Sequence, residues 1–274
     1  MKKKTILSAA VILIISFSAF SQKNVSMNYH YPDGKPVSYI KNQTIRQSLD
    51  IQGQAMDVYV TNLIGCNIKS AGGTNLTITV DTLAEVIDSP QGMMGGAVSE
   101  VNGKSFNLAL KPNGKVEDLS GAKNMTFTIP GQGPANLSAS FADFFPVLPE
   151  GKVDPGFTWN SVDTLDNSSG ASSQVTYMTS ENKFEGFEQI DGVNCAKITS
   201  NTTGTSKMKN EVQGMVMQTS GNFTGTETTW FSPESGYFIK HTATTKMTGN
   251  MEMPNEGYSF PVVMDINETT EVKK

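Results

Sequence analysis

Methionine is frequent in this chain, and in two places its spacing sets a pair of side chains on one face of a strand. There are 14 methionines, and one residue separates Met215 from Met217 and Met251 from Met253. Residues two apart on a strand point to the same side. A flexible thioether packs against varied apolar groups and is also a soft ligand for Cu(I). The pattern predicts core packing or the lining of an apolar cavity, with copper binding as a further alternative.

Two other segments offer apolar contacts. Residues 91–96 (QGMMGG) form a glycine-rich segment without the Lys and Ser/Thr of a phosphate-binding loop, so we expect a turn whose methionines cover an apolar opening. Residues 136–159 are rich in aromatic side chains. The candidate ligand-binding residues are Met93, Met94, Phe141, Phe144, Phe145, Trp159, Met215 and Met217.

Catalytic motifs are missing from the sequence. His30 and His241 are the two histidines, and neither lies in an HExxH motif or at another metal-ligand spacing. No GxSxG nucleophile motif occurs. Acid pairs such as Asp163 and Asp166 occur, but nothing in the sequence predicts that their carboxyl groups lie at the separation a glycosidase needs. We predict no catalytic residue, no metal site and no cofactor, and hence a protein that is not an enzyme.

Cys66 and Cys195 are the two cysteines. In an oxidising compartment they could form a disulfide that closes a long loop. Both also lie within expected strands, where a free thiol behaves as a small buried apolar group. The sequence leaves both alternatives open.

Two threonines match a short modification pattern. Asp81-Thr82-Leu83 and Asp163-Thr164-Leu165 fit the Asp-Ser/Thr-apolar sequence that some Gram-negative bacteria O-glycosylate in exported proteins. Thr82 and Thr164 are therefore candidate O-glycosylation sites.

The first 21 residues read as a secretory signal peptide. Lys2, Lys3 and Lys4 are followed by an apolar run over residues 6–20 and by Ala19-Phe20-Ser21, a small-x-small cleavage site. The apolar run is short for a membrane span. We expect an exported protein of the periplasm or the extracellular space, with no transmembrane segment after cleavage.

The charge of the chain argues against nucleic acid as a partner. The net charge at pH 7 is −5, and without the three signal lysines it is −8. Phosphate binding needs clustered Lys and Arg, and Arg46 is the single arginine.

Apolar residues recur at a spacing of two in most of the chain, as in strands with one buried face. Examples are Met56, Val58 and Val60, then Leu76, Ile78 and Val80. Turn sequences such as Asn102-Gly103 and Asp191-Gly192 separate these runs. The pattern predicts an all-β, mainly antiparallel protein, built as a large curved sheet or half-barrel.

A proline-rich connector divides the strand-rich regions. Residues 144–159 contain three prolines before Trp159, and residues 136–145 have the spacing of one short helix. We expect a β half over residues 22–133, the helix and connector over 134–156, and a second, similar β half over 157–274.

The segment from Pro149 to Trp159, with the signal peptide and paired β-rich halves, resembles a family of exported bacterial proteins of unknown function. The architecture also resembles the curved antiparallel half-barrels that carry lipoproteins and lipids across the periplasm. The resemblance implies a non-enzymatic protein that holds a hydrophobic small molecule or lipid against the curved sheet. The alternative is a structural or interaction protein of the cell envelope without a ligand cavity, whose protein partner the sequence does not name.

Overall fold

The structure is a computed structural model that describes residues 24–51, 53–129, 133–169, 172–212 and 215–274. The signal peptide expected over residues 1–21 lies outside the described residues. The chain is all-β and mainly antiparallel, as predicted.

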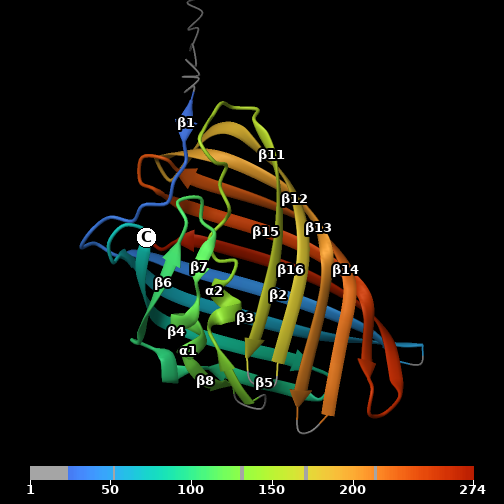
Figure 1. The fold of residues 1–274 in the computed structure, drawn as a ribbon. Coiled ribbons are helices and arrows are strands. Elements are labelled where there is room, and N and C mark those ends of the chain that lie inside the picture. Colours follow the sequence, from blue (N-terminus) through green and yellow to red (C-terminus); the bar gives the residue numbers. More distant parts are fainter. Residues whose placement is uncertain (1–23, 52, 130–132, 170–171, 213–214) are drawn as a thin grey trace, which may run out of the picture.

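Twelve strands form one large antiparallel sheet (Figure 1). The strands before the connector are β2 (Val37–Ile51), β3 (Gln54–Ser70), β4 (Asn75–Ser89), β5 (Gly92–Ala97), β6 (Ser105–Leu110) and β7 (Val116–Asp118). Those after it are β11 (Thr158–Ser169), β12 (Ser172–Ile190), β13 (Val193–Val212), β14 (Met215–Ser232), β15 (Tyr237–Met253) and β16 (Tyr258–Val272). Many of their residues are β-branched and alternate between buried and exposed positions, which favours strands with two different faces.

Each half is a meander, and the two meanders are joined side by side. The strand order is β11-β12-β13-β14-β15-β16-β2-β3-β4-β6-β7, with β5 paired to β4. The junction is an antiparallel pairing of β16 with β2, from Val262 opposite Leu49 to Val272 opposite Tyr39. Both expected halves therefore belong to a single sheet, which does not close into a barrel.

The remaining elements are short. They are β1 (Val25–Ser26), the 3-10 helix η1 (Ser99–Val101), α1 (Ser120–Asn124), β8 (Thr126–Ile129), β9 (Gly133–Asn136), α2 (Ser138–Phe141) and β10 (Lys152–Val153). The helix expected over residues 136–145 is confirmed in its first part only, and a second short helix precedes it. The turn expected over 91–96 is wrong, because β5 pairs with β4.

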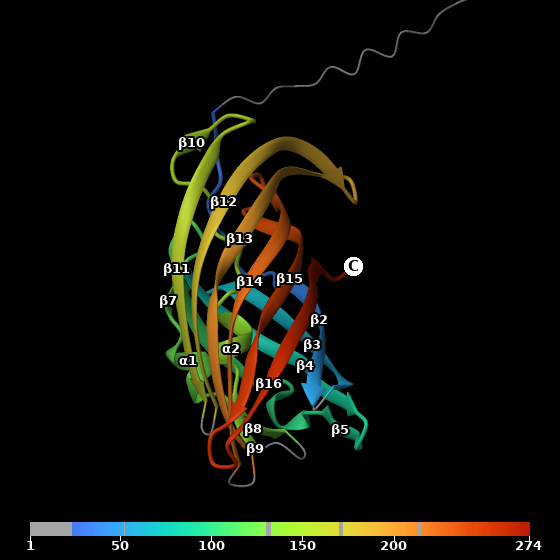
Figure 2. The same cartoon turned by 90° about the vertical axis from the view of Figure 1, so that its right-hand side faces the viewer.

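The segment between the halves packs against the concave side of the sheet, and Figure 2 shows the strands curving around α1 and α2. Phe144 contacts Tyr39 of β2 and Phe238 of β15, with ring centroids 5.7 and 6.0 Å apart. The first segment of the chain packs there too, since the Tyr29 hydroxyl donates to the carbonyl of Pro146 at 2.9 Å. One core cluster thus contains residues of both halves and of the connector.

Glycines at the centre of the concave side allow neighbouring strands to approach closely. Gly221 of β14 lies opposite Gly249 of β15. A Cβ atom on Gly249 would overlap the carbonyl oxygen of Ser220, and one on Gly221 would lie 2.9 Å from the Met247 methyl. Small residues at these positions permit strong sheet curvature.

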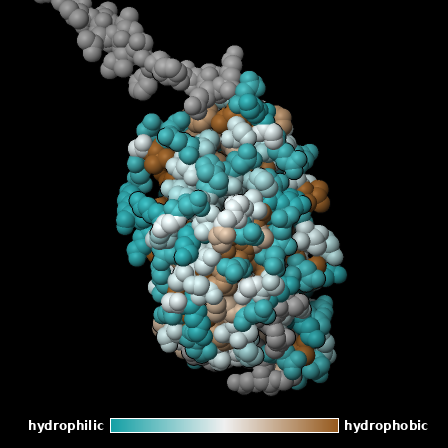
Figure 3. Space-filling view, turned by 60° about the vertical axis from the view of Figure 1, so that its left-hand side comes forward, coloured by the Kyte–Doolittle hydropathy of each residue, from teal (hydrophilic) through white to brown (hydrophobic). Residues whose placement is uncertain are grey.

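Figure 3 shows hydrophilic residues over most of one flank of the molecule, with hydrophobic residues in separate spots. Among the described residues, no helix has the length and apolar character needed to cross a membrane.

Candidate functional site

A second apolar cluster lies on the concave side, beyond the part that the connector covers. We call it the Met-rich face; its buried members are Leu49, Met247, Val262 and Met264, and its half-buried members are Ile51, Met56, Met208, Phe223 and Met251. All of these residues come from strands β2, β3, β13, β14, β15 and β16. The cluster includes no residue of the connector, so the sheet alone forms it. An apolar cluster that lies outside the main core is a candidate binding surface.

A row of polar residues separates the Met-rich face from the first core. The register of seven strand pairs aligns these residues across the sheet, with Ala243 of β15 between the two central glutamates. We call them the polar row: Asn182, Ser200, Glu227, Glu268, Gln43, Asn62 and Glu85. On β2, Lys41, Gln43 and Ile45 share one face, because residues two apart point to the same side. Lys41 precedes Gln43 and lies toward the first core, whereas Ile45 follows it and lies toward the Met-rich face.

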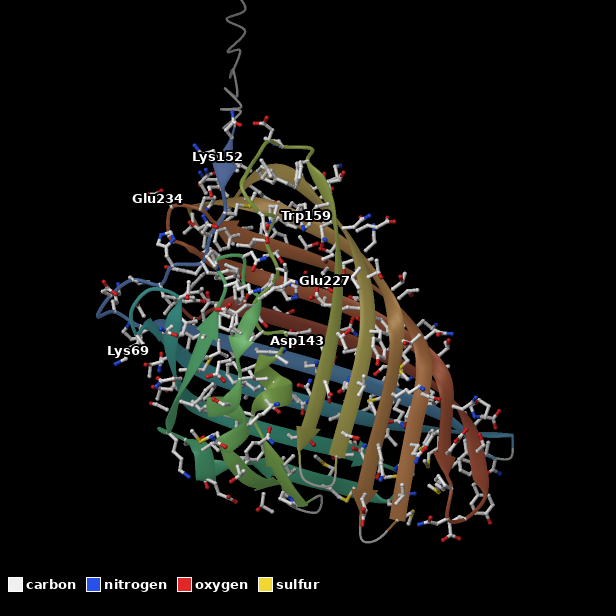
Figure 4. The ribbon with its side chains drawn as sticks, in the orientation of Figure 1. Lys69, Asp143, Lys152, Trp159, Glu227 and Glu234 are labelled. Carbon is white, nitrogen blue, oxygen red and sulfur yellow. The ribbon has the colours of Figure 1, made fainter. Side chains whose placement is uncertain are left out.

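An ion cluster anchors the row. The buried Lys41 ammonium lies 2.9 Å from one oxygen of Glu268 and 3.7 Å from Asp143, which follows α2. Gln43 donates to the other oxygen of Glu268 at 3.0 Å, and Asn62 donates to Gln43 at 3.0 Å. Figure 4 shows Asp143 and Glu227 over the middle of the sheet. A buried ion pair needs such extra hydrogen bonds to offset its desolvation.

Burial and charge shift the ionisation of this cluster. Burial lowers the pKa of Lys41, but Asp143 and Glu268 together outweigh it, so the pKa of the ammonium lies above its ordinary value. Burial raises the pKa of the Glu268 carboxyl. Burial also lowers the pKa of His241, whose Nδ1 lies 3.0 Å from the Thr229 hydroxyl. The cluster therefore combines a firmly charged lysine with a histidine that resists protonation.

Three of the expected ligand-binding residues are fixed parts of the first core. Phe141, Phe144 and Phe145 are 0, 2 and 3% exposed and pack on one another, on Tyr39 and on Phe106. Their rings are buried by other protein groups, and their contact with a ligand stays a prediction. They do cover the concave side, as expected of this segment.

The other five are spread over the sheet. Met94 and Met93 oppose Ile87 and Asp88, so they point to opposite faces, and Met93 is 73% exposed. Met215 and Met217 share the face of Met251, at the exposed end of β14. The remaining aromatic, Trp159, stacks on Phe157 and packs against the first core; its buried indole N–H has no partner among the described residues.

The two cysteines are free thiols, so the disulfide alternative is wrong. Cys66 lies in the first core and opposes Tyr39, whereas Cys195 neighbours core residue Ala196 and therefore points to the other face of the sheet. Burial raises the pKa of Cys195 to about 11 and that of Cys66 further still. Both thiols stay protonated and unreactive at neutral pH.

Thr82 and Thr164 are both exposed. Thr82 opposes Gly65 and Thr164 opposes Tyr177, which is itself exposed on the convex face. Both hydroxyls are accessible, and their O-glycosylation stays a prediction.

Sequence reasoning did not single out the polar row or five methionines of the Met-rich face as one site. A signal was present, since Gln43, Asn62 and Glu85 each interrupt an apolar alternation: Tyr39 to Ile45, Val60 to Ile64 and Leu83 to Ile87. The strand register that aligns them cannot be read from the alternation.

A pocket of about 500 Å³ lies elsewhere, between β6, β7 and α1. Its polar lining includes Asn75, Asn107, Asp118 and Asn124. Within the described residues, no group of three or more His, Cys, Asp or Glu side chains could hold a metal ion.

Comparison of the chain with protein-family models found no match, and comparison with curated proteins found none either. The geometry of the concave side is what bears on function.

Proposed function

We propose that the protein binds the apolar part of a hydrophobic small molecule or lipid on the Met-rich face. The observation that supports this most strongly is the position of that cluster: it lies on the curved side of the sheet, and the sheet alone forms it. Half-buried Met56, Met208 and Met251 can change rotamer to fit ligands of different shape. The binding is non-enzymatic, and export would place it in the periplasm or outside the cell.

The Met-rich face is also long enough for an alkyl chain. It spans six neighbouring strands, from Met208 of β13 to Met56 of β3, a distance of about 24 Å at the usual spacing between strands. Leu49 and Ile51 lie on it, and Ile45 shares its side of the strand. Removal of such a chain from water is favourable by about 25 cal/mol per Å² of buried apolar surface.

A paired variant tests this function. Met208→Gln combined with Met251→Gln places two polar amides on the face while keeping side-chain length, and should weaken binding of tetradecanol by roughly tenfold. Met93→Gln is the matched control, since Met93 opposes Asp88 on the other face, and it should bind as the parent does. Binding is measured by displacement of a fluorescent apolar probe, with circular dichroism as the check on folding.

Either of two results would contradict the proposal. One is a parent protein that binds neither the probe nor tetradecanol. The other is a folded double variant with unchanged affinity, because the ligand would then lie elsewhere.

A different observation supports the alternative, an interaction protein of the cell envelope. Val162 is 72% exposed on the edge strand β11, and Tyr177 is 56% exposed on its neighbour β12. Exposed apolar side chains on edge strands are typical of surfaces that meet another chain. A partner that co-purifies with the parent protein and is lost from the Val162→Lys variant would favour this function.

A further inference from the structure

The methionine pairs that the sequence singles out lie side by side at one end of the Met-rich face. Met215 and Met217 begin β14, and Met251 and Met253 end β15. These two strands pair antiparallel, so both pairs belong to the same end of the sheet. Their spacing alone leaves core packing, cavity lining and copper binding open, whereas the strand register shows how near the thioethers lie to one another.

Three of these methionines are cross-strand neighbours. Thr219 of β14 lies opposite Met251 of β15. Two residues further along, the same register sets Met217 opposite Met253. Side chains directly opposite each other have Cβ atoms about 5 Å apart, and diagonal neighbours such as Met217 and Met251 lie about 7–8 Å apart, within reach of long side chains. We call Met217, Met251 and Met253 the thioether group.

The thioether group is accessible from the concave side. Its three side chains share the face of Thr219, because residues two apart point to the same side, and all three are half-buried. Met208 of β13 also lies opposite Thr219, on the other side of β14, and adds a fourth thioether next to the group. A small ion could therefore reach these sulfur atoms without any opening of the sheet.

Aromatic rings border the group on the side of β16. Tyr258 lies opposite Met253 and Phe260 lies opposite Met251. The two rings stack with their centroids 5.9 Å apart. The sulfur atoms thus have an apolar wall beside them, which limits the water around an ion bound there.

The thioether group is a neutral and soft set of ligands. Glu252 lies between Met251 and Met253 in the sequence and so points to the other face of the sheet. The softer thiols do not contribute, because Cys66 and Cys195 are buried and burial holds both of them protonated. The group itself therefore supplies sulfur and no negative charge.

Such a set selects an ion by softness and charge. Thioethers suit Cu(I), whereas imidazole suits Zn²⁺ and carboxylates suit Mg²⁺ and Ca²⁺. A divalent ion would lie uncompensated beside the apolar wall, at a greater desolvation cost than a monovalent one. We propose that Met217, Met251 and Met253 bind one Cu(I) ion at this end of the β14–β15 pair, with Met208 beside them. For this ion the proposal departs from the expected absence of a metal site.

Competition for Cu(I) tests the site. The full chain is titrated into Cu(I) held by bicinchoninate, a coloured chelator, with ascorbate and without oxygen so that the ion stays reduced. The parent protein should withdraw about one Cu(I) per chain from the chelator. An excess of Zn²⁺ should not displace the bound ion, because neutral thioethers are poor ligands for it.

Leucine variants then locate the ion, since leucine removes the sulfur and keeps an apolar side chain of similar volume. Met217→Leu combined with Met253→Leu should weaken Cu(I) binding by at least about tenfold and leave tetradecanol binding as in the parent. Met93→Leu combined with Met94→Leu is the matched control. These two exposed methionines are adjacent in β5 and point to opposite faces, so Cu(I) affinity should not change. Circular dichroism checks that both variants fold.

The outcomes separate this site from the proposed function, on which it does not depend. A parent that binds tetradecanol and withdraws no Cu(I) overturns the metal site alone. So does a folded Met217→Leu, Met253→Leu variant with parental Cu(I) affinity, or an equal loss in the control variant. A parent that withdraws Cu(I) in the expected ratio but binds no tetradecanol supports the metal site and contradicts the proposed function.

Discussion

At the scale of single residues, the ion cluster of Lys41, Glu268 and Asp143 is the feature whose energy depends most on its partners. A buried charge is tolerated when it is paired and hydrogen-bonded, and it is costly when one partner is removed. The sequence shows Lys41 within an apolar alternation, which marks it as unusual. It does not show Glu268 as the partner, because the two are far apart in the chain and meet only through the β16–β2 register.

Lys41→Ala should lower the free energy of unfolding by about 3–5 kcal/mol, because the buried Glu268 carboxylate loses its counter-ion. Urea denaturation measures the change. Arg46→Ala is the matched control, since the Arg46–Asp57 pair is exposed to solvent and should contribute little to stability. Equal losses in the two variants would show that the Lys41 site is not desolvated.

His241 should make stability depend on pH. Because burial lowers its pKa in the folded state, the unfolded chain binds this proton first as the pH falls. Stability is therefore highest above the ordinary histidine pKa and is lost below it. Between about pH 7.5 and about pH 5.5 the parent should lose up to about 1 kcal/mol more than His241→Gln.

Urea denaturation at the two pH values checks this difference. A His241→Gln variant with the same slope as the parent would mean that His241 is hydrated in the fold.

At the scale of elements, alternation predicted the long strands well because each strand buries one face. It failed for β5, which has glycine at three of its six positions and yet pairs with β4 along its length. The helix was predicted too long, since α2 ends at Phe141, and the following aromatic residues are held by packing instead. The connector is therefore part of the hydrophobic core.

Phe144→Ala should cost about 3–5 kcal/mol of stability, because the ring lies between Tyr39, Phe141 and Phe238. Phe157→Ala, in the same connecting region but 42% exposed, should cost much less. Thermal and urea unfolding compare the two variants. A Phe144 variant as stable as the Phe157 variant would show that the connector leaves the sheet readily and could move as a lid.

At the scale of the whole molecule, the two halves should unfold together because they share one sheet and one core. The sequence predicted one large curved sheet with two similar halves, but not which strands join them, since no local pattern in β2 or β16 identifies the other strand as its neighbour. Long-range strand pairing is a property of the complete sheet.

Ile68→Ala in β3 tests this coupling. The side chain is fully buried in the N-terminal half, so the change should cost about 2–5 kcal/mol. Both tryptophans, Trp159 and Trp230, lie in the C-terminal half. Their fluorescence should report the same shifted urea midpoint as far-ultraviolet circular dichroism, and a tryptophan transition left at the parent midpoint would mean two independent halves.

The pairing of β16 with β2 has a consequence for the kinetics of folding. The last described strand, β16, lies at the middle of the sheet beside β2, the first long strand. One edge of β2 therefore stays unpaired until the chain has been synthesised as far as β16. Until then β2 presents unpaired backbone groups to any other strand it meets. We therefore expect slow folding with a strong tendency of nascent or truncated chains to associate, and a chaperone that shields β2 would raise the yield.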